Sequence, residues 1–368
     1  MSVLAWILGI LAIPTVAVLA WLGTVFVKEF RRSLREENAT VAYELPAASA
    51  ALGLLPQDQQ NTKAAGPTPA VLTAAVAAAE AGDWKPAAAL LQDTGKDWER
   101  RAVAVARLAT AAAEDDTWLL AWESEHPDSP DAAVLRARST VFLAWNIRGG
   151  KRARYTTGEQ FDGFHRTLER SREENARAAA LSPDDPIPYV GEIWTALGLG
   201  LPHAHMDRLW DRLTALAPHH YEAHFGALQY WCAKWRGSHE QARDFAARAA
   251  ASAPLGSLLT AFPLIAWFEE HHDTDTPQDA YLTPELTALV DAALSDAAAA
   301  PADHPRLPEV RHLLAYFLTM QDRDEASVEQ FRLVDGYVDA LPWRYDPDPA
   351  KEYCRLRDIT VKNAARGG

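Results

Sequence analysis

Histidines are the first residues whose type and spacing could support chemistry. The chain contains 12 of them, and in the segment HYEAH the residues His220 and His224 are four positions apart, so they would share one face of a helix. A helical zinc site of the His-Glu-x-x-His type requires glutamate directly after the first histidine, and this chain has Tyr221 there. We therefore interpret His219, His220 and His224 as turn and helix-start residues. A metal-dependent enzyme is the alternative; we predict no metal ligand and no cofactor.

A second candidate is a basic loop with the sequence IRGGKRARYTTGEQ at residues 147–160. A phosphate-binding P-loop needs a glycine where Trp145 stands and a serine or threonine where Arg152 follows the lysine, so that motif is excluded. Clustered cations beside two glycines nevertheless suit an anion, an acidic protein segment or a lipid head group. The predicted binding residues of this loop are Arg148, Lys151, Arg152 and Arg154. The alternative is a solvated connection, after which Thr157 and Gln160 form a capping box that starts the next helix.

A third candidate is the segment WCAKWRGSHEQA at residues 231–242. We expect WCAKW to end a helix, with Trp231 and Trp235 four residues apart on one face. Gly237 is expected to make the turn in a left-handed conformation, and Ser238 to cap the following helix. The predicted binding residues of this segment are Lys234, Trp235 and Arg236.

The remaining motifs and the composition argue against catalysis. The acidic stretches HPDSPDAAV and SPDDPIPYV are typical of helix starts, with Ser129 or Asp185 as the N-cap and a proline at the first helical position. No nucleophile-elbow or dinucleotide-binding motif is present, and neither Cys232 nor Cys354 has a catalytic signature around it. We therefore predict that the chain is not an enzyme. Its formal net charge of −14 also argues against nucleic acid as a partner, because phosphates require a basic face.

The elements that must position these residues are helices. Beyond residue 70 the apolar residues recur at helical spacing, and no period-2 alternation typical of strands appears. Three similar segments each contain an Ala/Leu-rich helix end, a proline and a new helix, with the prolines at Pro183, Pro218 and Pro254, 35 and 36 residues apart. Proline cannot continue a helix but is tolerated where one helix stops and the next begins, so we expect these prolines between helices.

This spacing resembles the tetratricopeptide repeat, a helix–turn–helix unit of 34 residues. The best match is residues 223–254, where Gly237 falls at the turn, Ala242 and Ala249 fall on the small positions of the second helix, and Pro254 ends the unit. The segments FLAWNIRGGKRARYTTGEQFDGFHRTL and QYWCAKWRGSHE are also similar to uncharacterised actinobacterial membrane-anchored helical-repeat proteins. The resemblance implies an all-α, tetratricopeptide-like helical-hairpin solenoid over residues 70–345. Such stacks present an extended concave surface that binds partner proteins.

Residues 1–35 are predicted to form a transmembrane anchor with a basic flank. The span 3–27 carries no charge, and about 20 apolar residues cross a bilayer. The cations that follow the span are Lys28, Arg31, Arg32 and Arg35. By the positive-inside rule they place the rest of a single-pass protein of the cell membrane in the cytoplasm. The alternatives are the opposite topology and a cleaved signal peptide, although no cation precedes the span and it is long for a signal sequence.

Two further segments complete the predicted organisation. Residues 36–69, rich in Ala, Pro, Gln and Gly, are expected to be a flexible linker, and residues 346–368 a C-terminal tail or terminal helix. The predicted function is a membrane-tethered protein–protein interaction or scaffold module. The alternatives are a module that binds an anion, a lipid head group or nucleic acid through residues 148–154, and the metal-dependent enzyme named above.

Overall fold

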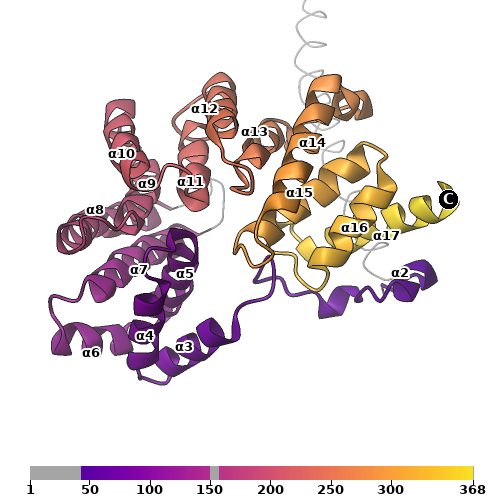
Figure 1. Cartoon of the computed structure of the whole chain (residues 1–368). Helices are drawn as coiled ribbons and strands as arrows, with labels where there is room; N and C mark the ends of the chain where they lie inside the picture. Colours follow the sequence, from indigo (N-terminus) through magenta and orange to yellow (C-terminus); the bar gives the residue numbers. More distant parts are fainter. Residues whose placement is uncertain (1–42, 150–156, 368) are drawn as a thin grey trace, which may run out of the picture. The chain divides into compact units, whose positions relative to one another are not determined.

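The structure is a computed structural model that describes residues 43–149 and 157–367 (Figure 1). The chain divides into the units Met1–Ala47 and Ala48–Gly368, and the second unit contains nearly all of the described residues. The helices, with four 3-10 turns marked η, are α2 (Ala47–Ala51), η1 (Gln57–Gln59), α3 (Ala70–Glu80), α4 (Lys85–Thr94), α5 (Trp98–Glu114), α6 (Thr117–Glu125), α7 (Pro130–Arg148), α8 (Gly158–Leu181), α9 (Ile187–Leu199), α10 (His203–Leu216), α11 (Tyr221–Trp231), α12 (His239–Ser252), η3 (Leu259–Ala261), α13 (Phe262–His271), η4 (Gln278–Leu282), α14 (Pro284–Ala299), α15 (Leu307–Met320), α16 (Asp324–Val334), η5 (Trp343–Tyr345) and α17 (Pro349–Gly367).

The predicted all-α class is confirmed for the described residues. They contain helices and no strand, with an isolated β-bridge between Asn61 and Tyr337. Helices that follow one another in sequence pack together, as α3 does with α4, α8 with α9 and α15 with α16. The arrangement is that of a helical repeat, in which the elements follow one another through the second unit in chain order (Figure 1).

Prolines mark the ends of these helices, as the sequence predicted. Pro183, Pro218 and Pro254 each lie two residues after the last residue of α8, α10 and α12, respectively. Local capping also follows the sequence. Ser129 accepts a hydrogen bond from the backbone N–H of Ala132 at 3.2 Å, and Thr157 forms a reciprocal capping box with Gln160. The local sequence predicts these caps because the cap side chain bonds a backbone N–H only two or three residues ahead.

Apolar side chains form an extended core rather than one central cluster. The largest cluster runs from α9 to α15 and includes Ile193, Leu228 and Phe262, all inaccessible to solvent. A second cluster fills the space among α3 to α7, where Trp118 and Trp122 are buried and Trp84 stacks on Trp122 at 5.2 Å. This distribution is expected for stacked helical pairs, because each pair buries its apolar face against the next.

Residues 54–66, which we call the N-terminal strap, belong to the segment predicted to be a flexible linker, and in the structure they contact the C-terminal part of the chain. Leu54 is buried, and the backbone N–H of Asn61 donates to the carbonyl of Gly336 at 2.8 Å. The backbone N–H of Val338 donates to Asn61 at 2.9 Å, and His312 bonds the carbonyl of Ala65 at 3.0 Å. The composition gave no sign of this order, because the partners of the strap lie on the far end of the chain.

The predicted anchor, with its span at residues 3–27 and its flank up to residue 35, lies outside the described residues. Within 43–149 and 157–367, no helix combines the length and apolar character that a bilayer crossing requires. The C-terminal residues 349–367 form the helix α17, which packs on α16.

Candidate functional site

The end of α7 carries one half of the candidate site. Arg148 is the last residue of this helix, and Gly149 caps it with a φ of 73°, a left-handed value that glycine adopts without steric cost. A cation in the last turn is stabilised by the negative end of the helix dipole. Trp145 lies one turn earlier on the same helix, so both side chains project from one face.

The turn between α11 and α12 carries the other half, and its geometry differs from the prediction. α11 ends at Trp231, so Trp231 and Trp235 do not share a helix face. Gly237 is not left-handed. It is required because a Cβ there would lie 1.9 Å from the carbonyl oxygen of Trp231. Ser238 caps α12 as predicted, accepting from the backbone N–H of Gln241 at 3.1 Å.

These two regions meet in a group that we call the Trp–Arg cluster, formed by Trp145, Arg148, Trp194 of α9 and Trp235. The Arg148 guanidinium lies 5.5 Å from the ring of Trp145 and 5.5 Å from that of Trp235, within the range of cation–π attraction. The two rings are perpendicular, with centroids 5.6 Å apart. Trp194 meets Trp145 edge to face at 6.5 Å. All four residues are half-buried.

The Trp–Arg cluster contains more hydrogen-bond donors than acceptors. Among the described residues, no acceptor reaches the buried Nε1 atoms of Trp145 and Trp194, although buried indole N–H groups usually find one. Arg148 donates to the carbonyl of Gly149 at 3.2 Å, and no carboxylate among the described residues pairs with it. Burial lowers the pKa of Arg148. The guanidinium is nevertheless fully protonated near neutral pH, since an arginine pKa stays far above 7.

The other predicted cations differ in whether the fold provides them with a partner. Lys234 donates to Glu269 at 2.6 Å and to the hydroxyl of Tyr345 at 2.9 Å, so it is neutralised within the fold. Arg236 is exposed at the turn, and its carbonyl bonds the ring of His203 at 2.8 Å. The predicted residues Lys151, Arg152 and Arg154 lie outside the described residues. The structure thus joins Arg148 to Trp235 and pairs Lys234 with a carboxylate of the same chain.

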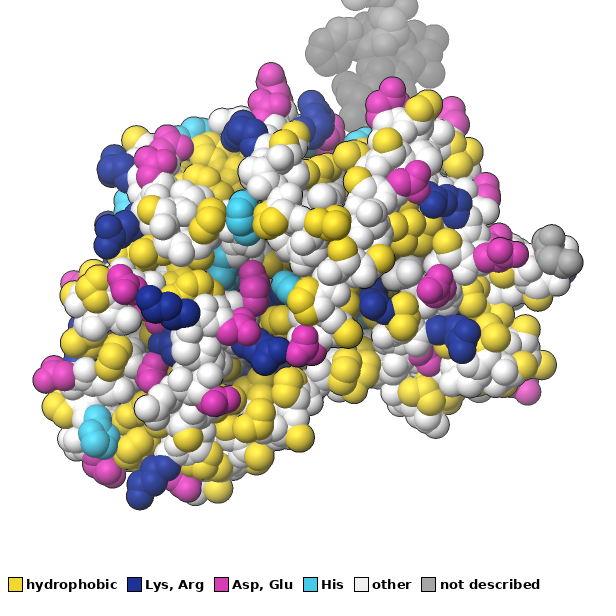
Figure 2. All heavy atoms as spheres, viewed as in Figure 1, with side chains coloured by type: hydrophobic (Ala, Val, Ile, Leu, Met, Phe, Trp, Pro, Cys, Tyr) yellow, Lys and Arg dark blue, Asp and Glu magenta, His cyan; other side chains and the backbone are white. Residues whose placement is uncertain are grey.

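A buried ionic network connects α7, α11 and the residue before α15, and no local sequence pattern predicted it. Glu222 on α11 accepts hydrogen bonds from Arg138 on α7 and, at 2.8 Å, from Arg306 directly before α15. Burial would raise the pKa of Glu222, but the two guanidiniums outweigh it and the pKa is lowered. Figure 2 shows side chains of both charges and histidines around a hollow between α5 and α15. The exposed pair Arg100 and Asp303 crosses between these regions at 2.5 Å.

A second buried network replaces an expected helix cap. Asp185 was predicted to cap α9, but Pro186 occupies the N-cap position. The Asp185 carboxylate accepts from the backbone N–H of Ile187 at 2.9 Å and pairs with Arg101 at 2.8 Å. Arg101 also pairs with Asp131 at 2.6 Å. Asp131 and Asp185 from the two acidic stretches therefore serve structural ion pairs.

Of the three histidines, His220 takes the helix-start role that the sequence favoured. His220 is the N-cap of α11, where its Nδ1 accepts from the backbone N–H of Ala223 at 3.2 Å. Its Nε2 bonds the carbonyl of Trp98 at 3.2 Å. Burial lowers the pKa of His224 to about 4. Over the part of the chain that the structure describes, no group of three or more His, Cys, Asp or Glu side chains is placed to hold a metal ion.

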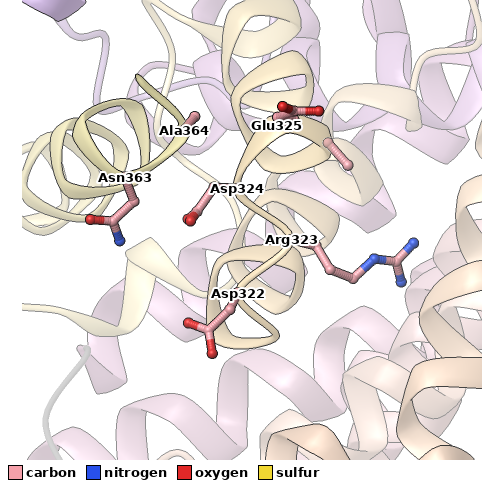
Figure 3. Close-up of a pocket in the computed structure, with 7 residues that line it drawn as sticks. Asp322, Arg323, Asp324, Glu325, Asn363 and Ala364 are labelled. Atoms are coloured by element: carbon pink, nitrogen blue, oxygen red, sulfur yellow. The ribbon is translucent and has the colours of Figure 1, made fainter. Parts of the chain in front are cut away.

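An open hollow of about 370 Å³ lies between the start of α16 and the end of α17 (Figure 3). Asp322, Asp324 and Asn363 line it, while Arg323 extends away and pairs with Asp291 at 2.7 Å (Figure 3). Burial, together with Asp322, raises the pKa of Asp324. The walls of the hollow offer polar groups at the surface and no enclosed apolar face, so the hollow lacks the features of a small-molecule site.

In comparisons with known proteins, the sequence matches no protein-family model and no curated protein. The candidate site is therefore defined by its residues alone.

Proposed function

We propose that this chain is a tetratricopeptide-like interaction module that binds a protein partner, held at the cell membrane by the predicted N-terminal anchor. The observation that carries the proposal is the Trp–Arg cluster, in which α7, α9 and the α11–α12 turn bring three indole rings and one guanidinium together at half-buried positions. Tryptophan and arginine are the residues that most often dominate the energy of protein interfaces.

The chemistry of the described residues favours binding over catalysis. Burial raises the pKa of the Cys232 thiol to about 12, so almost no thiolate is present near neutral pH. The ring nitrogens of His220 serve a helix cap and a backbone carbonyl. The proposed role of the module is therefore to hold a partner at the membrane surface.

Proximity labelling in the native membrane tests the proposal. The full chain is expected to enrich one or a few proteins over a control that carries residues 1–35 alone. Trp235→Ala should reduce that enrichment by about tenfold or more, as for an interface hot spot. Trp118→Phe, buried in the core among α3 to α7, is the matched tryptophan control and should leave the enrichment unchanged. Equal labelling by the full chain and the anchor control would count against the proposal.

The proposed topology requires its own measurement, because it decides which proteins the module can meet. Protease added outside intact cells should leave the C-terminal domain uncut if that domain faces the cytoplasm. Cleavage before the membrane is opened would instead place the domain outside and exclude cytoplasmic partners.

A further inference from the structure

The Trp–Arg cluster has an unfilled requirement that identifies a ligand chemistry. Three arginines of the described residues that are more buried than Arg148 have carboxylate partners: Arg101 pairs with Asp185, Arg138 with Glu222, and Arg136 with Glu123. Arg148 is held by two indole rings and one backbone carbonyl, without such a partner. The cation is positioned, but no carboxylate of residues 43–149 or 157–367 neutralises its charge.

The rings fix the orientation of this cation. Contact with the rings of both Trp145 and Trp235 restricts the planar group, so less side-chain entropy is lost when it binds an acceptor. A guanidinium edge offers two parallel N–H groups whose spacing matches the two oxygens of a carboxylate. The surrounding indoles exclude water from part of the site, which strengthens the attraction between the charges.

We propose that Arg148 in the Trp–Arg cluster binds a carboxylate of a protein partner, with the side chains that flank this carboxylate packing on Trp145 and Trp235. This inference rests on the proposed function and specifies its partner as an acidic segment that also carries apolar residues. A ligand of this kind brings the acceptors and negative charge that the cluster lacks.

A membrane surface fits the described residues less well. Binding to anionic lipid depends on several exposed basic side chains, each contributing weakly. Here Lys234 is paired with Glu269, and Arg148 is half-buried among rings. One oriented guanidinium with apolar walls suits a single carboxylate on an apolar segment.

The test uses the full chain, labelled with fluorotryptophan, in nanodiscs of neutral lipid. The probe is the blocked peptide acetyl-Leu-Glu-Leu-amide, with the glutamine peptide as its uncharged match. The fluorine NMR signals of Trp145 and Trp235, assigned from Trp→Phe variants, should shift with the glutamate peptide only. Arg148→Gln should weaken binding at least about tenfold, because a charge-assisted bidentate contact is lost. Arg355→Gln removes an exposed cation on α17 that is not a binding candidate, and it should bind as the wild type does.

The opposing outcomes are distinct. Equal shifts with both peptides, no shift with either, or full binding by Arg148→Gln would overturn the carboxylate assignment. Shifts produced by phosphatidic acid in the nanodisc, without peptide, would overturn it in favour of a lipid phosphate. If Arg148→Gln has a lowered melting temperature, Arg148→Lys replaces it. That variant keeps the charge without the planar fork, and it should bind the glutamate peptide more weakly than the wild type while still preferring it to the glutamine peptide.

The proximity-labelling experiment separates the two proposals. Loss of partner labelling with Trp235→Ala but not with Arg148→Gln would leave the protein-binding function standing and refute the carboxylate. Retention with both variants would refute the Trp–Arg cluster as the binding surface.

Discussion

Replacing Glu222 by glutamine should destabilise the fold more than any exposed charge substitution. Glu222 is 8% exposed and lies between two guanidiniums, those of Arg138 and Arg306. These three residues belong to α7, α11 and the segment before α15, so one carboxylate connects parts of the chain that are far apart in sequence. Glutamine keeps the volume and one acceptor oxygen but removes the negative charge.

The magnitude follows from what the variant leaves behind. Arg138 would remain buried beside Arg306, and repulsion from Arg306 together with burial already lowers the pKa of Arg138. Removing one partner of a buried ion pair costs about 3–5 kcal/mol, because the remaining charge is left uncompensated. At about 2 °C for each kcal/mol in a large domain, the melting temperature should fall by about 6–10 °C.

Thermal unfolding followed by circular dichroism near pH 7 measures this effect. The control is Glu352→Gln, which breaks the exposed pair between Glu352 and Arg355 on α17 and should cost less than about 1 kcal/mol. If Glu222→Gln lowers the melting temperature no more than Glu352→Gln does, the view that the network holds α7, α11 and α15 together is refuted.

The same carboxylate has a defined dependence on pH. The pKa of Glu222 in the folded chain lies below its ordinary value of 4.5, so its contribution is complete above pH 4.5 and is lost as the pH falls towards the folded-state pKa. The difference in melting temperature between the wild type and Glu222→Gln should therefore narrow below pH 4.5. A difference that stays constant down to pH 3 would contradict the assignment of the stabilisation to the charge.

Three further predictions concern other buried groups. Burial lowers the pKa of His312 to about 3, so the contribution of His312 to stability is complete above pH 6.5 and decreases as the pH falls. Between pH 7 and pH 4, the melting temperature should therefore decline less steeply for His312→Gln than for the wild type. Gln60→Ala removes the acceptor of the Gly336 backbone N–H and should cost about 1–3 kcal/mol, with faster amide exchange at Gly336 as the direct sign that the N-terminal strap has loosened. Cys232, whose pKa burial raises to about 12, should react with iodoacetamide only after unfolding in urea; fast reaction in the folded state would show that it is accessible.

The sequence predicted the local structure well where the determining contacts are short in range. Ser129, Thr157 and Ser238 cap helices as expected, and Pro183 and Pro218 lie between helices. Each of these features depends on hydrogen bonds or steric limits that act within about four residues.

Predictions that required a specific distant partner were incomplete or wrong. Asp185 lies one residue before the N-cap of α9 and pairs with Arg101, and the end of α11 at Trp231 separates Trp231 from Trp235. The strap residue Asn61 was assigned to a flexible linker because its partners at Gly336 and Val338 lie at the opposite end of the chain. No local pattern carries information about such pairings.

The candidate site shows the same division. The sequence identified cations and a tryptophan beside glycines as binding candidates, namely Arg148, Lys151, Arg152, Arg154, Lys234, Trp235 and Arg236. Only the packing of α7 against the turn after α11 brings Arg148 to Trp235, and only the fold supplies Glu269 to neutralise Lys234.

The sequence by itself determined the helices, their ends and the kinds of side chain available, because helical hydrogen bonds close within one turn and depend on adjacent residues. Among the described residues, the tertiary structure decided that Lys234 is paired with a carboxylate and that Arg148 lies against two indole rings instead. These outcomes depend on the relative placement of whole helices, which is set by burial of apolar surface along the entire stack.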